Sequence, residues 1–377
     1  MDFALNEEQS ILQKTVRGFM EKECPKSRVR QLLEDKDGNF PELWGKMAAL
    51  GLLGVVFPAE YGGGDGTFMD LVILCEEIGR NLCPSPFLST VVLGGLLILE
   101  AGNEAQKKQI LGGISAGQTI VAVALTDVDE STEMDSVNTE AVFEKGEYAI
   151  HGTKVFVPYA HIADYILCVA KTKVGHDFNA GHNIFIVESK SPGITCTELK
   201  TLSRDRQFEV VFDNVRVPKE NIIGQADRGW PILEKILKKA AIVLSAEMVG
   251  GADAVLDMAL KYAKQRVQFG QKIGSFQSIQ HHLANLWLDV TGCRHLVYKA
   301  AWKVDHGKGF AMDSAMAKAR AGKAYRRATI TGHQILGAVS FTWEHDMHLY
   351  HRNSIVEDLL LGDGDFQKEI VAKELGL

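Results

Sequence analysis

One stretch of this chain combines an arginine, two amides and an aromatic residue where a helix should end: Gln265-Arg266-Val-Gln268-Phe269-Gly270. It follows an apolar segment over 232–244, in which large aliphatic residues recur at helical spacing. Arginine can donate two hydrogen bonds to one phosphate, and phenylalanine offers a flat face to an aromatic ring, so the set can hold a dinucleotide. The alternative is a surface arginine that stabilises a helix C-terminus beside a core phenylalanine, and the residue types alone favour it.

The longer pattern resembles the FAD-contacting motif of the acyl-CoA dehydrogenase family, and the resemblance extends along nearly the whole chain. In this sequence the pattern is Arg-x-Gln-Phe-Gly-x-x-Ile-x-x-x-Gln. The resemblance implies that the arginine and the first glutamine grip the FAD pyrophosphate, while the phenylalanine and the last glutamine line the cofactor of a neighbouring subunit's site. The cofactor-binding residues implied here are Arg266, Gln268, Phe269, Ile273, Phe276 and Gln277.

The amino-acid composition limits the classes of protein to which this chain can belong. The chain has 377 residues, 46% hydrophobic and 24% charged, which is typical of a globular protein of more than one subdomain. A formal net charge of −7 argues against a nucleic-acid surface. Its six cysteines include no Cys-x-x-Cys pair, which favours buried thiols in a reducing compartment over a disulfide framework or a metal site. With no secretory signal at Met1–Asn6 and no apolar run long enough for a membrane span, we expect a cytoplasmic protein.

The hydrophobic period changes twice along the chain. Residues 1–115 show helical spacing, most clearly at 7–23, 43–53, 69–82 and 91–101. Residues 116–225 alternate with period two in short runs, among them 148–151 and 155–157, and include a hairpin turn at 144–147, which predicts a small β-barrel or sandwich. Residues 226–377 return to helical spacing. We therefore predict an α+β multidomain protein with an N-terminal helical domain, a middle β domain and a C-terminal four-helix bundle, which is the architecture that the family resemblance also implies.

Further flavin contacts in the β domain are implied by the resemblance. Leu125-Thr126 matches the pair that the family sets against the isoalloxazine ring, and Phe156 can stack on that ring. The family's following loop is altered in this sequence, which affects the contact assigned to Thr132. Pro158 stands where the family directs a threonine at the flavin N5 edge, and proline supplies neither the hydroxyl nor the backbone N–H.

A second turn, Gln334-Ile-Leu-Gly337-Ala338, resembles the family segment that reaches the FAD diphosphate across a subunit interface. It implies cofactor contacts from Gln334, Gly337 and Ala338, and hence an oligomer, most plausibly a tetramer. The acidic and histidine residues at 344–351 invite comparison with a metal site, but a solvated or interface face is the preferred interpretation, and we predict no metal.

The catalytic base of the family has no counterpart at its usual position in this sequence. Dehydrogenation between Cα and Cβ of an acyl thioester needs a base for the α-proton and a flavin to accept the hydride. The usual family position of the base is Leu361 in this sequence, and a second family position is Ala240. Glu247 lies two helical turns beyond Ala240 on the same face, among apolar neighbours. We predict Glu247 as the base. The alternative is that Glu247 is a buried carboxylate paired with an arginine or lysine.

The resemblance thus implies an FAD-dependent acyl-CoA dehydrogenase that forms a 2,3-enoyl-CoA and passes electrons to an electron-transfer flavoprotein. Leu361 and Pro158 motivate a second hypothesis, a non-catalytic subunit that completes an FAD site in a heteromeric dehydrogenase. An oxidase or monooxygenase on the same scaffold is a third. A homotetramer or a heterotetramer with a related subunit fits the first two hypotheses.

Overall fold

The structure is a computed structural model that describes residues 4–35, 41–128, 137–172 and 181–377. The chain divides into two compact units that interleave along the sequence. The first unit comprises Met1–Glu34, Thr67–Pro84 and Lys238–Leu377, and the second comprises Asp35–Gly66 and Ser85–Leu237. Each unit is described separately below.

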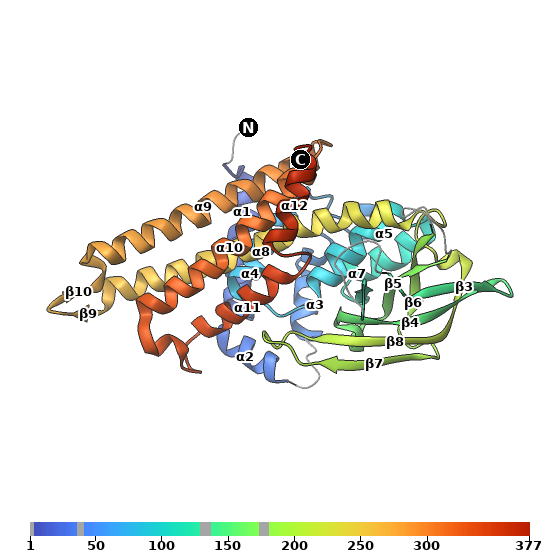
Figure 1. Cartoon of the computed structure of the whole chain (residues 1–377), viewed down its shortest axis with the longest axis horizontal. Coiled ribbons are helices and arrows are strands. Elements are labelled where there is room, and N and C mark those ends of the chain that lie inside the picture. The colour runs from blue at the N-terminus through green and yellow to red at the C-terminus, as the bar shows by residue number, and fades with distance from the viewer. Residues whose placement is uncertain (1–3, 36–40, 129–136, 173–180) are drawn as a thin grey trace. The chain divides into compact units, whose positions relative to one another are not determined.

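The first unit is helical. Its helices are α1 (Glu7–Glu23), α2 (Lys26–Glu34), α4 (Phe68–Asn81), α9 (Gln277–Asp305), α10 (Ala311–Leu336), α11 (Met347–Leu359) and α12 (Gly364–Glu374), together with most of α8 (Gly229–Gln265). Two short strands, β9 (Val267–Gln268) and β10 (Gln271–Lys272), and a 3₁₀ turn, η8 (Ile273–Ser275), connect α8 to α9, and a further 3₁₀ turn, η9 (Gly337–Phe341), follows α10. Figure 1 shows α8, α9 and α10 running alongside one another, with the β9–β10 hairpin where α8 and α9 meet.

Local sequence explains where several of these helices begin. Asn6 and Gln9 form a capping box at the start of α1, and Thr67 and Asp70 form another at the start of α4. Each box satisfies backbone N–H groups that the first helical turn leaves without partners. The predicted helix at 7–23 is confirmed at both ends, whereas α2 was not predicted, because its apolar positions are few.

The second unit contains the β domain and short helices. Its helices are α3 (Pro41–Ala49), α5 (Leu96–Ala101), α6 (Glu104–Gln106) and α7 (Gly112–Ser115), with π-helical segments at Leu88–Gly95 and Lys107–Leu111. Shorter 3₁₀ turns lie at Leu52–Gly54, Ala59–Tyr61, Ala160–Ile162 and Lys219–Asn221. Its strands are β1 (Val121–Ala124), β2 (Thr126–Asp127), β3 (Glu140–Glu144), β4 (Glu147–Pro158), β5 (Tyr165–Lys171), β6 (His182–Glu188), β7 (Ile194–Leu199) and β8 (Gln207–Pro218).

These strands form one eight-stranded sheet, and the middle β domain predicted from the sequence is confirmed (Figure 1). The strand order is β1-β5-β3-β4-β8-β7, with β2 added to β4 and β6 to β5. Two predicted strands, 148–151 and 155–157, are parts of the single long strand β4, and β7 was not predicted, because most of its residues are exposed. The predicted hairpin turn joins β3 to β4, with Lys145 and Gly146 both at positive φ.

Three glycines determine how the helices of the first unit pack. A Cβ atom on Gly250 of α8 would lie 1.8 Å from the Glu76 carbonyl oxygen on α4, and one on Gly79 would lie 2.1 Å from the Glu247 carbonyl oxygen. A Cβ on the adjacent Gly251 would lie 2.4 Å from the ring of Tyr325 on α10. Because these side chains are missing, the α4 backbone and the Tyr325 ring of α10 both pack closely on the middle of α8.

We expect Gly250→Ala to destabilise the protein by about 1–3 kcal/mol or more, because the helices must separate to admit one methyl group. Gly292→Ala is the matched control: Gly292 lies within α9, and its added Cβ would meet nothing within 4 Å. That control should raise stability by up to about 1 kcal/mol through helix propensity alone. Urea unfolding of both variants measures the difference, and equal effects from the two substitutions would contradict the close-crossing interpretation.

Candidate functional site

The residues predicted to bind the cofactor pyrophosphate lie at a hairpin between α8 and α9. The sequence predicted that a helix ends here; the structure shows that the connection to the next helix contains a two-stranded hairpin in which Gln268 pairs with Gln271. Phe269 and Gly270 form its two-residue turn, with φ values of 54° and 80°. Positive φ at both positions is the signature of a type I′ turn, whose twist matches that of paired strands.

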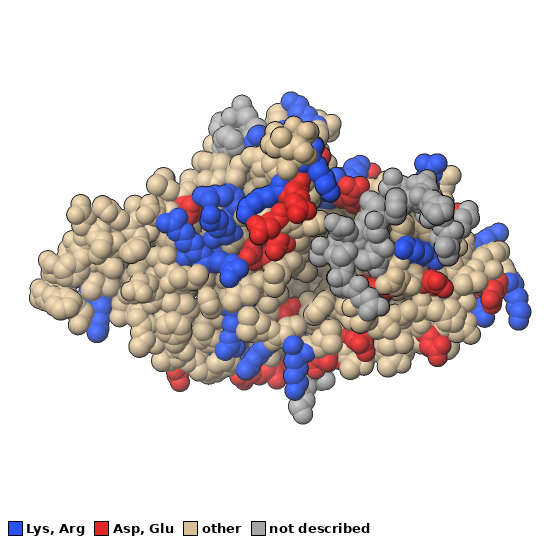
Figure 2. Space-filling view, viewed as in Figure 1, with Lys and Arg blue, Asp and Glu red and all other residues tan. Residues whose placement is uncertain are grey.

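Phe269 is unusual in two respects. Its ring is 93% exposed, and a bulky side chain at positive φ costs roughly 1–3 kcal/mol of backbone strain. Its ring contact with Phe276, at a centroid distance of 6.3 Å, buries little of it. The face shown in Figure 2 carries few charged side chains around this hairpin. Strain and exposure together indicate a turn shaped to contact another molecule.

Arg266 immediately precedes this hairpin and is exposed. Its backbone N–H donates to the Tyr262 carbonyl at 2.8 Å, and its own carbonyl accepts from the Ile273 N–H at 2.9 Å, so the backbone at the base of the hairpin is fixed. Among the residues that the structure describes, no carboxylate forms an ion pair with its guanidinium. An exposed, uncompensated arginine beside an exposed aromatic ring fits the phosphate and ring systems of FAD. Gln277 is also exposed, at the first position of α9, while Ile273 and Phe276 are half-buried.

The predicted flavin contacts of the second unit lie on two adjacent strands. Thr126 of β2 pairs with Val155 of β4, which places Leu125 and Thr126 beside Phe156. The register between β4 and β8 shifts between Lys154 and Val157, so Phe156 lies in a bulge, at φ 54° and 58% exposed. A bulge redirects a side chain out of the alternation of its strand, and here it presents an aromatic ring on the surface. Pro158 is the last residue of β4. Thr132 lies outside the described residues.

The third predicted cofactor segment follows α10. Gln334, Gly337 and Ala338 are all exposed, and Gly337 has a φ of 72°, which lets the backbone leave the helix. Behind this turn His333 accepts or donates a 2.7 Å hydrogen bond with the Ser340 hydroxyl and stacks on Phe341 at 4.2 Å. The residues predicted to bind the cofactor therefore fall in both units: four described positions lie in the second unit and the other described ones in the first.

Glu247 lies in the first unit at the crossing of α8 with α4. Its side chain is largely buried, and burial, followed by the charge of Glu357 on α11, raises the pKa of its carboxyl well above the usual value. Among the described residues no lysine or arginine forms an ion pair with it, so the alternative of a paired structural carboxylate lacks the expected cation. The sequence did not reveal Glu357, which comes from a distant helix, and Asn353 donates a 2.9 Å hydrogen bond to its Oε1 atom.

The loop that carries Leu361 is held firmly. Lys318 of α10, which is 1% exposed, donates to the carbonyl oxygens of Asp358 at 2.9 Å and Gly362 at 3.0 Å. Gln367 donates a further bond to the Leu361 carbonyl at 2.8 Å. Burial lowers the pKa of the Lys318 ammonium to about 8. Leu361 itself has a φ of 60°, which is strained for leucine. Its side chain cannot accept a proton.

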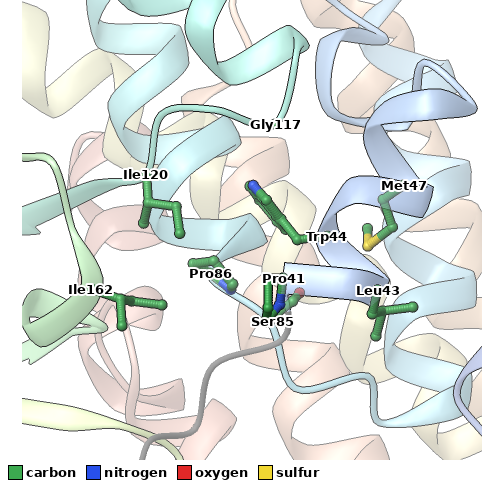
Figure 3. Close-up of a pocket in the computed structure, with 9 residues that line it drawn as sticks. All are labelled: Pro41, Leu43, Trp44, Met47, Ser85, Pro86, Gly117, Ile120 and Ile162. Carbon is green, nitrogen blue, oxygen red and sulfur yellow. The ribbon is translucent and has the colours of Figure 1, made fainter.

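A small cavity of about 190 Å³ lies within the second unit (Figure 3). Its lining is almost entirely apolar, and Figure 3 shows the Trp44 indole between Ile120, Pro86 and Met47. None of the predicted site residues lines it, and it is smaller than the roughly 300–1,000 Å³ of typical ligand pockets. It therefore does not identify the cofactor site.

Among the described residues, no group of three or more His, Cys, Asp or Glu side chains is arranged to hold a metal ion. No helix in the described parts of the chain combines the length and apolar content needed to cross a membrane.

Comparison with known proteins gives matches along the whole chain. Three family models match: "Acyl-CoA dehydrogenase, N-terminal domain" over residues 6–118, "Acyl-CoA dehydrogenase, middle domain" over 122–215 and "Acyl-CoA dehydrogenase, C-terminal domain" over 227–376. The chain is 31% identical to the probable acyl-CoA dehydrogenase YngJ of Bacillus subtilis, with 100% of both chains covered.

Two solved structures are similar over nearly their full length. The butyryl-CoA dehydrogenase of Megasphaera elsdenii has a TM-score of 0.93 and 30% identity, with 100% of each chain covered. A chain of the ChsE4–ChsE5 complex from Mycobacterium tuberculosis has a TM-score of 0.90 and 26% identity, covering 100% of this chain and 99% of that one.

The histidines around the turn after α10 predict acid sensitivity. Burial, followed by the charges of His351, His345 and His348, lowers the pKa of His333 to about 4 from its usual 6.5, and burial also lowers the pKa of the other three. The folded protein therefore binds fewer protons than the unfolded chain, and stability present above pH 6.5 should be lost as pH falls towards 4. We expect His333→Gln to flatten this loss in urea titrations between pH 7.5 and 5, whereas exposed His281→Gln should leave it unchanged. Identical pH profiles for both variants would contradict the assignment.

Proposed function

Because the chain belongs to the acyl-CoA dehydrogenase family, we propose that it oxidises an acyl-CoA thioester to the 2,3-enoyl-CoA with FAD and passes the electrons to an electron-transfer flavoprotein. The observation that carries the proposal for this chain is the half-buried Glu247 carboxylate on α8, whose pKa is raised and which has no cation partner among the described residues. We propose a cytoplasmic location, consistent with the free cysteines of the described chain.

Glu247 is the proposed base for the α-proton. Its surroundings disfavour the charged form, so the ionised carboxylate is a stronger base than one in water. Burial provides most of this effect, and the neighbouring charge of Glu357 adds to it. Bound FAD supplies the hydride acceptor, which no side chain of the chain can replace. Proton removal should therefore become faster as pH rises and Glu247 ionises.

The same proposal assigns the cofactor contacts. Arg266 and Gln268 would hold the pyrophosphate, and the exposed positions of both fit that role. Leu125, Thr126 and Phe156 would face the isoalloxazine ring. A second copy or a related subunit would supply the remaining contacts, so the working unit is a homotetramer or heterotetramer. The remaining contact residues in that proposal are Phe269, Ile273, Phe276, Gln277, Gln334, Gly337 and Ala338.

A second candidate function rests on Leu361. The loop around it keeps its full set of hydrogen bonds from Lys318 and Gln367, yet it presents an apolar side chain where the family resemblance implies the base. Pro158 likewise offers no hydrogen bond at the implied flavin edge. These two residues favour a subunit that completes an FAD site in a heteromeric dehydrogenase, and the similarity to a chain of the ChsE4–ChsE5 complex supports this alternative.

Purification of the chain alone distinguishes the two functions. The dehydrogenase should retain FAD and show bleaching of the flavin absorbance when a suitable acyl-CoA is added without oxygen. A protein that binds FAD only after a related subunit is added, or whose flavin no acyl-CoA reduces, is better explained as the completing subunit. Rapid reaction of the reduced flavin with oxygen would instead indicate an oxidase.

Glu247→Gln tests the base. The amide keeps the size and hydrogen bonding of the side chain but cannot accept a proton, so acyl-CoA should still bind while the rate of anaerobic flavin reduction falls by about 10²–10⁴-fold. Exposed Glu369→Gln on α12 is the control and should reduce at the wild-type rate. A near-normal rate for Glu247→Gln would exclude this role and direct attention to Asp363 and Asp365.

Arg266→Ala tests the pyrophosphate contact. The variant should fold normally and bind FAD more weakly by roughly 1.5–3 kcal/mol, the contribution of a hydrogen bond to a charged group. Exposed Lys264→Ala, two residues earlier, removes a positive charge from the same helix end and should change FAD affinity little. Titration of the apoprotein with FAD gives both dissociation constants. Equal values for the Arg266 variant and the wild type would remove the basis of the cofactor assignment.

A further inference from the structure

A buried ion pair lies beneath the strands that carry the proposed flavin contacts. Lys154 of β4 is 0% exposed and Asp127 of β2 is 4% exposed. The Lys154 Nζ atom lies 2.5 Å from Asp127 Oδ2 and donates a second hydrogen bond, at 3.0 Å, to the Leu125 carbonyl oxygen. The cation therefore binds both the residue before Thr126 and the residue after it.

Asp127 accepts hydrogen bonds at both of its oxygen atoms. Oδ1 accepts from the Thr139 N–H at 3.2 Å and from the Thr139 hydroxyl at 2.5 Å, while Oδ2 also accepts from the Asn138 N–H at 3.2 Å. The carboxylate thus joins the start of the 128–137 segment to its end. Every polar atom of the pair has a partner, which is the condition for burying charge without a prohibitive cost.

The local structure of the sheet accommodates the ion pair and the hydrogen bonds of Thr139. Asp127 and Lys154 are directly opposite each other in the pairing of β2 with β4. Gly152 of β4, at φ 152°, leaves room for Thr139, because a Cβ atom at Gly152 would lie 2.5 Å from the Thr139 hydroxyl oxygen. Glycine and the bulge at 150–152 together let Thr139 reach the carboxylate.

Stability alone does not account for such a pair. Removing two ions from water costs free energy that offsets much of their mutual electrostatic attraction. Well-packed apolar residues can therefore often replace a buried ion pair with no loss of stability. A buried ion pair has a clearer role where it specifies a conformation that apolar packing alone would not fix. Here it fixes Leu125, which precedes β2, and Thr126 of β2 and, two residues from Lys154, the bulge that exposes Phe156.

We propose that Lys154 is a positioning residue for the flavin: together with Asp127 it sets the Leu125–Thr126 backbone and the adjacent Phe156 bulge at the isoalloxazine ring. This inference rests on the proposed function, since it requires FAD at these strands. Lys154 does not touch the cofactor in this proposal. It acts through the Leu125 carbonyl and through Asp127, so the bound flavin should report any change at Lys154 before the overall fold does.

The test separates positioning from stability by removing the charge of Lys154 alone and then both charges of the pair together. Lys154→Met leaves Asp127 charged and buried and should lower the melting temperature strongly. The double variant Lys154→Met/Asp127→Asn removes both charges, and the new amide oxygen can still accept from Thr139. Lys154→Arg keeps a cation in place, and exposed Lys190→Met in the same unit is the matched control. Melting temperature, the FAD dissociation constant and the visible absorption and circular dichroism of bound flavin are measured for each.

We expect the double variant to recover most of the melting temperature lost by Lys154→Met while its FAD dissociation constant stays at least about tenfold above the wild-type value and its flavin bands remain shifted. Lys154→Arg should fall between the double variant and the wild type, and Lys190→Met should match the wild type. A double variant with wild-type stability, affinity and flavin spectrum would show that the pair is structural only. If the wild-type protein binds no FAD under any condition, the proposed function itself fails, and that result is distinct from normal binding by the double variant.

Discussion

The contact between α4 and α8 at two glycines is the constraint on which the first unit depends. Gly79 and Gly250 bring the two helix backbones so close that neither position has room for a methyl group. Glu247 lies at this contact, and burial, followed by the charge of Glu357 on α11, raises the pKa of its carboxyl. The basicity proposed for Glu247 is thus a property of helix packing, because the same carboxyl on an exposed helix would have an ordinary pKa.

Much of the fold could be predicted from the sequence, for identifiable reasons. The helix at 7–23 and the hairpin at 144–147 carry local signals, a capping box and two residues that accept positive φ, and both predictions are confirmed. Strand β7 could not be predicted, because its exposed residues give no apolar alternation. The hairpin after Arg266 was also missed, since a phenylalanine at positive φ is outside the usual turn preferences.

In the candidate site, too, some features could be predicted from the sequence and others could not. Exposure of Arg266 at a helix end could be predicted, whereas the residue types alone favoured a core phenylalanine at position 269, and Phe269 is 93% exposed. Lys154 had a weak signal: it shares the inward face of β4 with Ile150 under a period of two, which is an unusual position for a lysine. Asp127 and Glu357 had none, because their importance arises from residues distant in sequence, Thr139 and Glu247, that only the folded chain brings near them.

The carboxylate of Asp127 has a consequence for how this protein can change over evolutionary time. It ties Asn138 and Thr139 to β2, so the two ends of the intervening segment are anchored in the sheet independently of what lies between them. These anchoring contacts involve only residues at the two ends of that span, so they do not depend on the sequence between them. Selection on a few end residues can therefore preserve the pairing of β2 with β4 while the intervening sequence varies.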